Sequence, residues 1–240
     1  MTRPAEVGTI VVGAGIAGIA AAARLRRSGV TDVLVLERAH DVGGTWRDNV
    51  YPGVACDIPA HLYSFSFRPN AGWSRRFAPG AEIQEYLREV VRAEGLAPQI
   101  LLGTDVTAMT WLDEDRRWLL ATTRGDYLCR VLVMAAGRLS EPVQPSLPGL
   151  GGFRGTVMHS SGWVPDLDLD GARVAVVGTG ASAVQLVPEL ARAGASVTVF
   201  QRTAPYVVPR EDAAIPSARR AEFAARPEAM RAHRDELFAR

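Results

Sequence analysis

The chain has 240 residues, of which 48% are hydrophobic and 22% are charged, and its formal net charge is +1. This length suits one large domain or two small ones with a sizeable core, and the composition excludes a disordered chain. A net charge so close to zero gives no indication of nucleic acid or of an anionic membrane as a partner.

The first 36 residues predict a βαβ unit. Thr9–Val12 is typical of a buried strand, Ile16–Arg27 of a helix that Gly29 ends, and Val33–Leu36 of a second strand. The longest apolar run, Ile10–Ala23, contains three glycines and is too short to span a bilayer. We therefore expect no membrane association.

Residues 40–140 combine a long irregular loop with further regular elements. Residues 40–79 are rich in glycine, proline and aromatic residues, and a loop of that length inside a domain usually has a function. Helical spacing returns at Ala81–Glu94, and three strands are predicted at Val106–Leu112, Trp118–Thr123 and Tyr127–Met134. We assign residues 1–140 to a first Rossmann domain.

The second half repeats the strand–helix–strand pattern. Residues 141–152 hold three prolines and three glycines and form the best linker candidate, which we extend to residue 165. Arg173–Val177, Ala181–Ala193 and Ser196–Phe200 follow as strand, helix and strand. The predicted fold class is α/β with two tandem Rossmann-like dinucleotide-binding units. The second, residues 166–240, is incomplete, and its Arg-rich tail, Ser217–Arg240, is predicted to be a solvated helix pair interrupted at Pro227.

A GxGxxG fingerprint, Gly13, Gly15 and Gly18, joins the first predicted strand to its helix. Its first glycine permits a tight turn, its second lets a pyrophosphate approach the helix N-terminus, and its third allows close helix–sheet packing. Glu37 stands 19 residues after Gly18, at the end of the next strand, where an acid can accept hydrogen bonds from ribose hydroxyls. The pattern predicts a site for FAD or NAD.

A second fingerprint, of the form GxGxxA, opens the later helix with Gly178, Thr179, Gly180 and Ser182. The strand after it ends before Arg202 and Thr203, with no acid. A carboxylate there would repel a 2′-phosphate, whereas Arg202 can pair with one. This unit is predicted to bind NADP; the alternative is an exposed arginine at a strand end.

Two nucleotide units in one chain indicate a two-nucleotide flavoenzyme. Disulfide reductases of this architecture need a redox-active cysteine pair, but Cys56 and Cys129 are the two cysteines and lie far apart. Such cysteine usage also fits a reducing cytosol, so we expect a cytoplasmic protein. We predict no metal site.

Two longer patterns extend these fingerprints. The first runs Gly43, Gly44, Thr45 and Trp46, then Tyr51, Pro52 and Gly53, and ends at Asp57. The second, between the two units, consists of Phe153, Gly155, His159 and Trp163, followed by Val164. In both patterns the chain resembles type I Baeyer–Villiger monooxygenases, which are class B flavin-dependent monooxygenases, and the resemblance covers residues 8 to about 210. That family usually has proline or aspartate at the position of Val164.

The resemblance implies roles for these positions. FAD would be held by Gly13, Gly15, Gly18, Glu37, Gly44, Thr45 and Trp46, with further contacts from Tyr63 and Val106. Asp57 would lie near the isoalloxazine as the catalytic residue, where the family uses it to position an arginine and the nicotinamide. NADPH would be held by Gly178, Thr179, Gly180, Ser182, Arg202 and Thr203. The hinge fingerprint would be Phe153, Gly155, His159 and Trp163.

The implied reaction starts with reduction of the flavin by NADPH. A flavin C4a-peroxide formed with O₂ would then insert one oxygen atom into a ketone or aldehyde. Two alternatives stay open: an N- or S-directed monooxygenase on the same scaffold, which Trp163 disfavours, and a non-catalytic nucleotide-binding fragment. We expect that these residues alone do not complete the oxygenation site, and that a C-terminal half, encoded separately or together with them, is required.

Overall fold

The computed structural model describes residues 3–239, and their contacts divide them into two compact units. The first unit combines the segment up to Asp48 with Gln84–Glu141, and the second combines Asn49–Ile83 with the segment from Pro142 onward. The predicted nucleotide-binding domains, residues 1–140 and 166–240 with a linker at 141–165, stay a prediction, because compactness does not test which residues bind a nucleotide.

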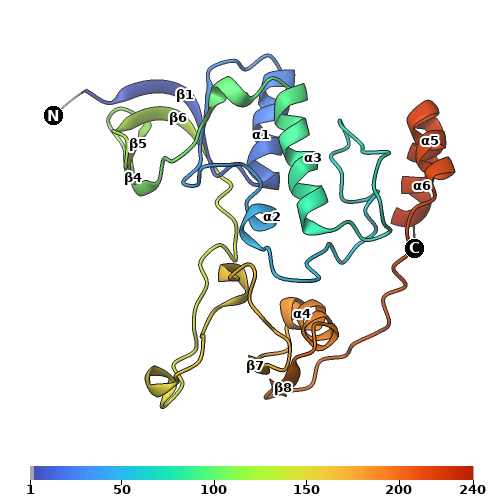
Figure 1. Cartoon of the computed structure of the whole chain (residues 1–240). Coiled ribbons are helices and arrows are strands. Elements are labelled where there is room, and N and C mark those ends of the chain that lie inside the picture. Colours follow the sequence, from blue (N-terminus) through green and yellow to red (C-terminus); the bar gives the residue numbers. More distant parts are fainter. Residues whose placement is uncertain (1–2, 240) are drawn as a thin grey trace. The chain divides into compact units, whose positions relative to one another are not determined.

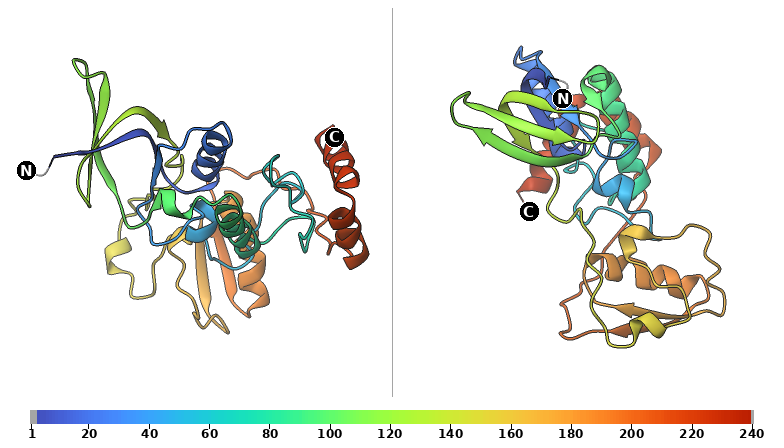
Figure 2. Two further views of the ribbon diagram at one scale, coloured as in Figure 1. Left: turned by 90° about the horizontal axis from the view of Figure 1, so that it is seen from above. Right: turned by 90° about the vertical axis from the view of Figure 1, so that its left-hand side faces the viewer.

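A six-stranded sheet forms the centre of the first unit (Figure 1). Its strands are β1 (Ala5–Val12), β2 (Val33–Leu36), β3 (Ile100–Leu101), β4 (Val106–Leu112), β5 (Arg117–Thr122) and β6 (Tyr127–Met134). In the order β3-β2-β1-β6-β5-β4, the first four strands pair in parallel. β6, β5 and β4 then form a twisted antiparallel meander (Figure 2). The predicted α/β class is confirmed.

Two helices and most of a third complete this unit: α1 (Ile16–Arg27), α2 (Thr45–Asp48) and, from Gln84 onward, α3 (Gly80–Ala93). α1 and α3 run side by side (Figure 1), with an ion pair of 2.8 Å between Arg27 Nε and Glu94 Oε2. Leu87 and Val90 of α3 are fully buried, as the helical spacing predicts. A short 3₁₀ helix, Ala97–Gln99, precedes β3.

The central strands carry the core of the first unit. Ile10, Leu36, Leu120 and Cys129 come from β1, β2, β5 and β6, and each is at most 1% exposed. β1 has a parallel partner on each side, so its apolar run is unbroken instead of alternating. The carboxyl ends of β1 and β2 are therefore held rigidly, and the fingerprint turn and Glu37 follow there.

The second unit contains a two-stranded parallel sheet, β7 (Arg173–Val177) and β8 (Ser196–Phe200), joined through α4 (Ala181–Arg192). Short 3₁₀ helices lie at Leu150–Gly152 and Ser160–Gly162. Tyr51, Leu186 and Leu190 form its buried cluster, against which Trp163 packs. The long loop thus contributes Tyr51 to the core of this unit.

The tail of the second unit is a helix pair, α5 (Ser217–Ala225) and α6 (Pro227–Phe238) (Figure 1). The predicted break is found at Arg226, whose φ of −130° is typical of a residue before proline. The expectation of a solvated pair is wrong on one face, because Phe223 and Met230 are 2% and 4% exposed. Arg240 lies outside the described residues. Between residues 3 and 239, no helix is long and apolar enough to cross a membrane.

Candidate functional site

The turn after β1 shows why its glycines are required. Gly13 has a φ of +100°, and a Cβ there would lie 2.6 Å from the Ala135 carbonyl oxygen. A Cβ on Gly18 would lie 1.8 Å from the Gly13 carbonyl oxygen. Both glycines are therefore demanded by the fold itself.

Gly15 is different. Its φ is −76°, and among the described residues outside its own turn a Cβ would approach only Gly44, at an ordinary 3.6 Å from Cα. Packing within the chain thus does not require a glycine at this position. Because Gly15 and Gly44 both lack a side chain, a ligand can approach the Gly15 backbone closely.

Gly15 is the N-cap residue of α1. This residue makes no side-chain capping hydrogen bond, and the described first turn of α1 holds no acidic residue. The first N–H groups of the helix and the positive end of its dipole are therefore available to an anion.

The loop 43–48 packs against this turn. The Gly43 N–H donates to the Ala14 carbonyl oxygen at 3.0 Å. Gly44 has a φ of +51°, and a Cβ there would lie 3.0 Å from Gly15 Cα, so the two glycine backbones face one another. Thr45 is exposed and Trp46 is buried in α2. The structure thus brings the Gly-Gly-x-Trp half of the first long pattern onto the fingerprint turn.

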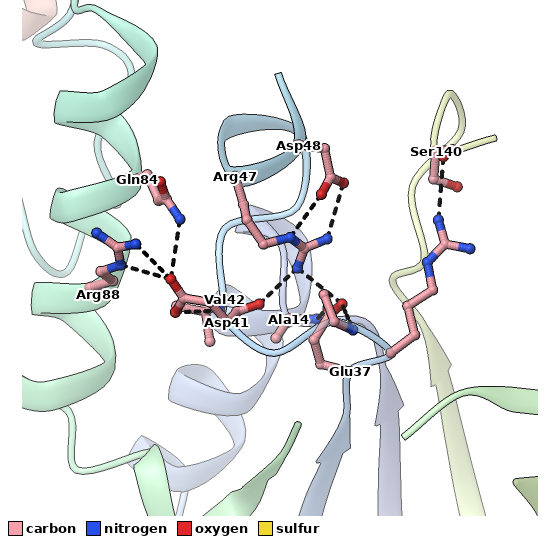
Figure 3. Close-up of polar contacts among 11 residues, drawn as sticks. Ala14, Glu37, Asp41, Val42, Arg47, Asp48, Gln84, Arg88 and Ser140 are labelled. Carbon is pink, nitrogen blue, oxygen red and sulfur yellow. Dashed lines mark hydrogen bonds and ion pairs between the residues drawn. The ribbon is translucent and has the colours of Figure 1, made fainter. Parts of the chain in front are cut away.

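Glu37 directly follows β2 and is buried, being 5% exposed. Its Oε2 accepts a hydrogen bond of 2.7 Å from the Ala14 N–H, inside the fingerprint. Its Oε1 accepts from the Ala39 N–H and from Arg47 Nη1, each at 3.0 Å (Figure 3). The predicted acid therefore lies directly beside the turn.

Arg47 is a residue of this site that the sequence reasoning missed. Its guanidinium also donates to the Asp41 carbonyl oxygen at 2.7 Å and pairs with Asp48 through two hydrogen bonds of 2.8 and 3.0 Å (Figure 3). Burial acts to lower the pKa of Arg47, but the hydrogen bonds to Asp48 and the attraction of Glu37 raise it overall. The available signal was an arginine directly after Gly-Gly-x-Trp, ten residues beyond a buried acid.

Val106, the remaining predicted FAD contact in this unit, begins β4. It pairs with Thr122 of β5 and packs, half-buried, against the core cluster. This placement explains its burial and leaves a cofactor contact as a prediction.

The second fingerprint has the same backbone form. Gly178 has a φ of +106°, and its N–H donates to the Phe200 carbonyl oxygen at 2.9 Å. Gly180 precedes α4 without a side-chain capping hydrogen bond. A Cβ on either glycine would meet nothing within 4 Å in the part of the chain described. As at Gly15, the backbone at Gly180 is open to a ligand.

Polar groups and a groove flank this fingerprint within the second unit. Thr179 and Ser182 are half-buried, whereas Arg202 and Thr203 are exposed after β8. Gln201 and Ala204, which flank Arg202 and Thr203 in the sequence, are among the residues that line a groove of about 360 Å³. The predicted 2′-phosphate ligands are therefore accessible to a bound molecule.

Residues 51–57 are fastened to α4 by Gln185, a second residue that the sequence reasoning missed. Tyr51 Oη donates to Gln185 Oε1 at 3.0 Å, and Gln185 Nε2 donates to the Ala55 carbonyl oxygen at 2.8 Å. Gly53 has a φ of +81°, and a Cβ there would lie 2.7 Å from the Gln185 carbonyl oxygen. The Tyr-Pro-Gly half of the first long pattern is thus a packing surface for α4.

The predicted residues Asp57 and Tyr63 also belong to the second unit. Asp57 is exposed, and Tyr63 is half-buried. Between Asp57 and the packed Ala55, Cys56 is 1% exposed, and burial raises the pKa of its thiol. Cys56 is therefore a buried, weakly reactive thiol next to an accessible carboxylate.

The hinge fingerprint residues have local structural roles. His159 caps the 3₁₀ helix at Ser160–Gly162, because its Nδ1 accepts from the Ser161 N–H at 3.1 Å. Trp163 packs on the buried cluster. Phe153 is exposed, and its ring lies where a Cβ on Gly155 would be, 2.6 Å from the nearest ring atom. These contacts account for the residue types, and hinge motion stays a prediction.

The chain is similar to known proteins over nearly its whole length. Residues 10–217 match the family described as pyridine nucleotide-disulphide oxidoreductase. A Baeyer–Villiger monooxygenase of Streptomyces coelicolor is 49% identical over 97% of this chain and 45% of its own length.

Two solved structures are also similar. Cyclohexanone monooxygenase from Rhodococcus sp. Phi1, bound to NADP+, superposes with a TM-score of 0.86 at 34% identity, over 95% of this chain and 44% of that one. OTEMO in complex with FAD and NADP superposes with a TM-score of 0.81 at 30% identity, over 93% of this chain and 45% of that one. The chain spans under half the length of these relatives. It belongs to the pyridine nucleotide-disulphide oxidoreductase family.

Proposed function

We propose that this chain provides FAD- and NADPH-binding parts of a monooxygenase of Baeyer–Villiger type. The observation that carries the proposal is a pair of helix N-termini preceded by glycines. The N-terminus of α1 lies beside the buried Glu37, and the strand that follows α4 leads to the exposed Arg202. Such an enzyme inserts one atom of O₂ into a small ketone or aldehyde. The residues that the longer relatives have beyond the matched region, on the same polypeptide or on another, would complete its site.

FAD fits the first fingerprint. Its pyrophosphate would take the free N–H groups at the start of α1, which the Gly15–Gly44 cradle leaves open. Glu37 would accept a hydrogen bond from the adenosine ribose. Thr45 and Trp46, in α2, would border the flavin end.

NADPH fits the second fingerprint. The N-terminus of α4 would hold its pyrophosphate through the backbone of Gly178, Thr179 and Gly180, with Ser182 in the first turn. Arg202 and Thr203 would bind the 2′-phosphate, because both are exposed and no carboxylate precedes them on β8.

Further roles follow from the resemblance. Asp57, with its exposed carboxylate, would orient the nicotinamide, and Tyr63 and Val106 would add FAD contacts. Phe153, Gly155, His159 and Trp163 would let the two nucleotide sites change their relative position during turnover. When bound, the flavin and NADPH would supply hydride transfer and oxygen activation, and this chain would hold both nucleotides in orientation. Disulfide chemistry is disfavoured, because Cys56 and Cys129 are both free and buried.

A heteroatom monooxygenase is the second candidate function. Trp163, where N- and S-directed enzymes usually have tyrosine or phenylalanine, favours ketone oxygenation. The two are separated by supplying the protein that carries this sequence with NADPH, O₂ and either a cyclic ketone or a thioether. Lactone formation coupled to NADPH consumption supports the proposal. Formation of the sulfoxide alone supports the second candidate. If neither the lactone nor the sulfoxide forms, both candidate functions are contradicted.

FAD binding is tested by fluorescence titration of the flavin-free protein. We expect Glu37→Ala to weaken FAD binding, because loss of a charge-assisted hydrogen bond costs about 1.5–3 kcal/mol. Glu114→Ala is the matched control, since Glu114 is an exposed acid in the turn between β4 and β5. Equal FAD retention by Glu37→Ala and Glu114→Ala would contradict the placement of FAD at the first fingerprint.

Coenzyme preference is tested by anaerobic flavin reduction with NADPH and NADH. We expect the parent to prefer NADPH by about tenfold or more, which corresponds to about 1.4 kcal/mol. Arg202→Ala should remove this preference. Arg192→Ala, at the far end of α4, should keep it. Equal efficiencies with both coenzymes in the parent protein exclude the assignment of the second fingerprint to NADPH.

A further inference from the structure

The two oxygens of the Glu37 carboxylate are unequally engaged. Oε1 accepts from the Ala39 N–H and from Arg47 Nη1, each at 3.0 Å, whereas Oε2 accepts from the Ala14 N–H at 2.7 Å. A carboxylate oxygen has two lone-pair acceptor sites. Within residues 3–239, Oε1 is therefore saturated and Oε2 keeps one site unused.

Arg47 is itself held in one position. Its Nη1 donates to the Asp41 carbonyl oxygen at 2.7 Å, and its Nε and Nη2 form a two-pronged pair with Asp48. Asp41 is fastened in turn to α3, through Arg88 Nη2 at 2.6 Å (Figure 3). A planar guanidinium bound on three sides cannot rotate to release Glu37.

The charges explain why a cation is needed there. Glu37 is a buried carboxylate beside a helix N-terminus that is open to an anion. A pyrophosphate bound at that N-terminus would repel an unpaired carboxylate, and burial of an unpaired charge is costly. The side chain of Arg47, which is 15% exposed, pairs with Oε1 of Glu37, whereas the Ala14 N–H bonds to Oε2. Arg47 therefore balances the charge of Glu37 without covering Oε2.

We propose that Arg47 is a positioning residue for FAD, which holds Glu37 so that Oε2 faces the adenosine ribose as a hydrogen-bond acceptor. This inference rests on the proposed function, since it requires FAD at the first fingerprint. Arg47 does not contact the ribose in this arrangement. It acts through Glu37, and its effect therefore depends on the ribose hydroxyls.

The test compares two ligands on the flavin-free protein by equilibrium fluorescence titration. One is FAD, and the other is an FAD analogue whose adenosine ribose lacks both hydroxyls. We expect Arg47→Met to weaken FAD binding by about tenfold, as for loss of one charge-assisted hydrogen bond, and to leave analogue binding within about twofold. Arg92→Met is the control, because it removes an exposed guanidinium of α3 that pairs with Glu85 and touches neither Glu37 nor Arg47. It should leave both affinities unchanged.

The outcomes separate the possibilities. Equal weakening of both ligands by Arg47→Met would mean that Arg47 supports only the loop, and unchanged FAD affinity would mean that Glu37 is positioned without it. Either result overturns the proposal. A parent protein that binds no FAD refutes the proposed function instead.

Two further variants keep the test decisive if Arg47→Met does not fold. Asp48→Asn loosens the guanidinium and keeps its charge, so it should weaken FAD binding selectively, by less than Arg47→Met. Arg47→Lys can still reach Glu37 and should restore part of the affinity. If neither variant distinguishes FAD from the analogue, the proposal is wrong.

Discussion

His61 lies enclosed beneath the tail helices and is 5% exposed. Its ring stands edge-on to Phe223 of α5 and His233 of α6, with centroids 5.1 and 5.2 Å apart. In the described part of the chain its buried Nε2 has no hydrogen-bond partner. Burial, followed by the positive charges of His233, Arg234 and Arg219, lowers the pKa of His61 from 6.5 to about 4.

This shift predicts that the second unit loses stability in mild acid. An unfolded histidine takes up a proton near its ordinary pKa, whereas the folded His61 resists protonation until about pH 4. The contribution is therefore fully present above the unfolded pKa and is lost as the pH falls from about 6.5 toward 4. Between pH 7 and pH 5, this one group should reduce the free energy of unfolding by about 2 kcal/mol.

The measurement is urea unfolding at pH 7 and pH 5 at constant ionic strength, for the parent and for His61→Phe. Phenylalanine keeps an aromatic ring against Phe223 and removes the titrating nitrogens, so the variant should lose about 2 kcal/mol less than the parent. His40→Gln, at an exposed histidine, is the control and should respond as the parent does. An identical loss in His61→Phe and the parent would refute the reasoning.

Three substitutions test the packing. Gly18→Ala should lower the free energy of unfolding by more than about 2 kcal/mol, because its Cβ would overlap the Gly13 carbonyl oxygen. Gly15→Ala should lower it by less than about 1 kcal/mol and should mainly weaken FAD binding. Thermal unfolding and FAD titration of both variants check this, and similar unfolding temperatures would contradict it. Phe223→Ala should cost about 3–4 kcal/mol in urea unfolding, because the ring is 2% exposed. A loss below about 1 kcal/mol would show that the tail helices do not contribute to the core.

Most regular elements followed from local sequence. The bounds of α1 and of β2, β4, β6, β7 and β8 are those predicted, because each strand is a stretch rich in apolar and β-branched residues and the start of α1 is set by a fingerprint turn. β1 begins at Ala5 instead of Thr9, since its first residues are recruited by pairing with β6, where Ala5 lies opposite Tyr127. α2 and β3 were missed, because elements of four and two residues carry no periodicity.

The residues of the candidate site that are related by local spacing were also predictable. Gly13, Gly18 and Glu37 stand where the spacing required, because turn geometry and strand length relate them within one βαβ unit. Arg47 and Gln185 were not predicted. Their partners are chosen by the path of the long loop, which no local pattern describes.

The sequence by itself determined the two nucleotide fingerprints, the elements around them and the family resemblance. Each of these depends on residues a few positions apart, where backbone preferences and hydrophobic period decide the outcome. Only the tertiary structure decided that residues 49–83 pack with the segment from Pro142 onward, that Phe223 and Met230 are buried, and that Arg47 pairs with Glu37. Such contacts depend on which surfaces meet once the chain has folded, and the local sequence around a residue does not identify a partner that is distant in the chain.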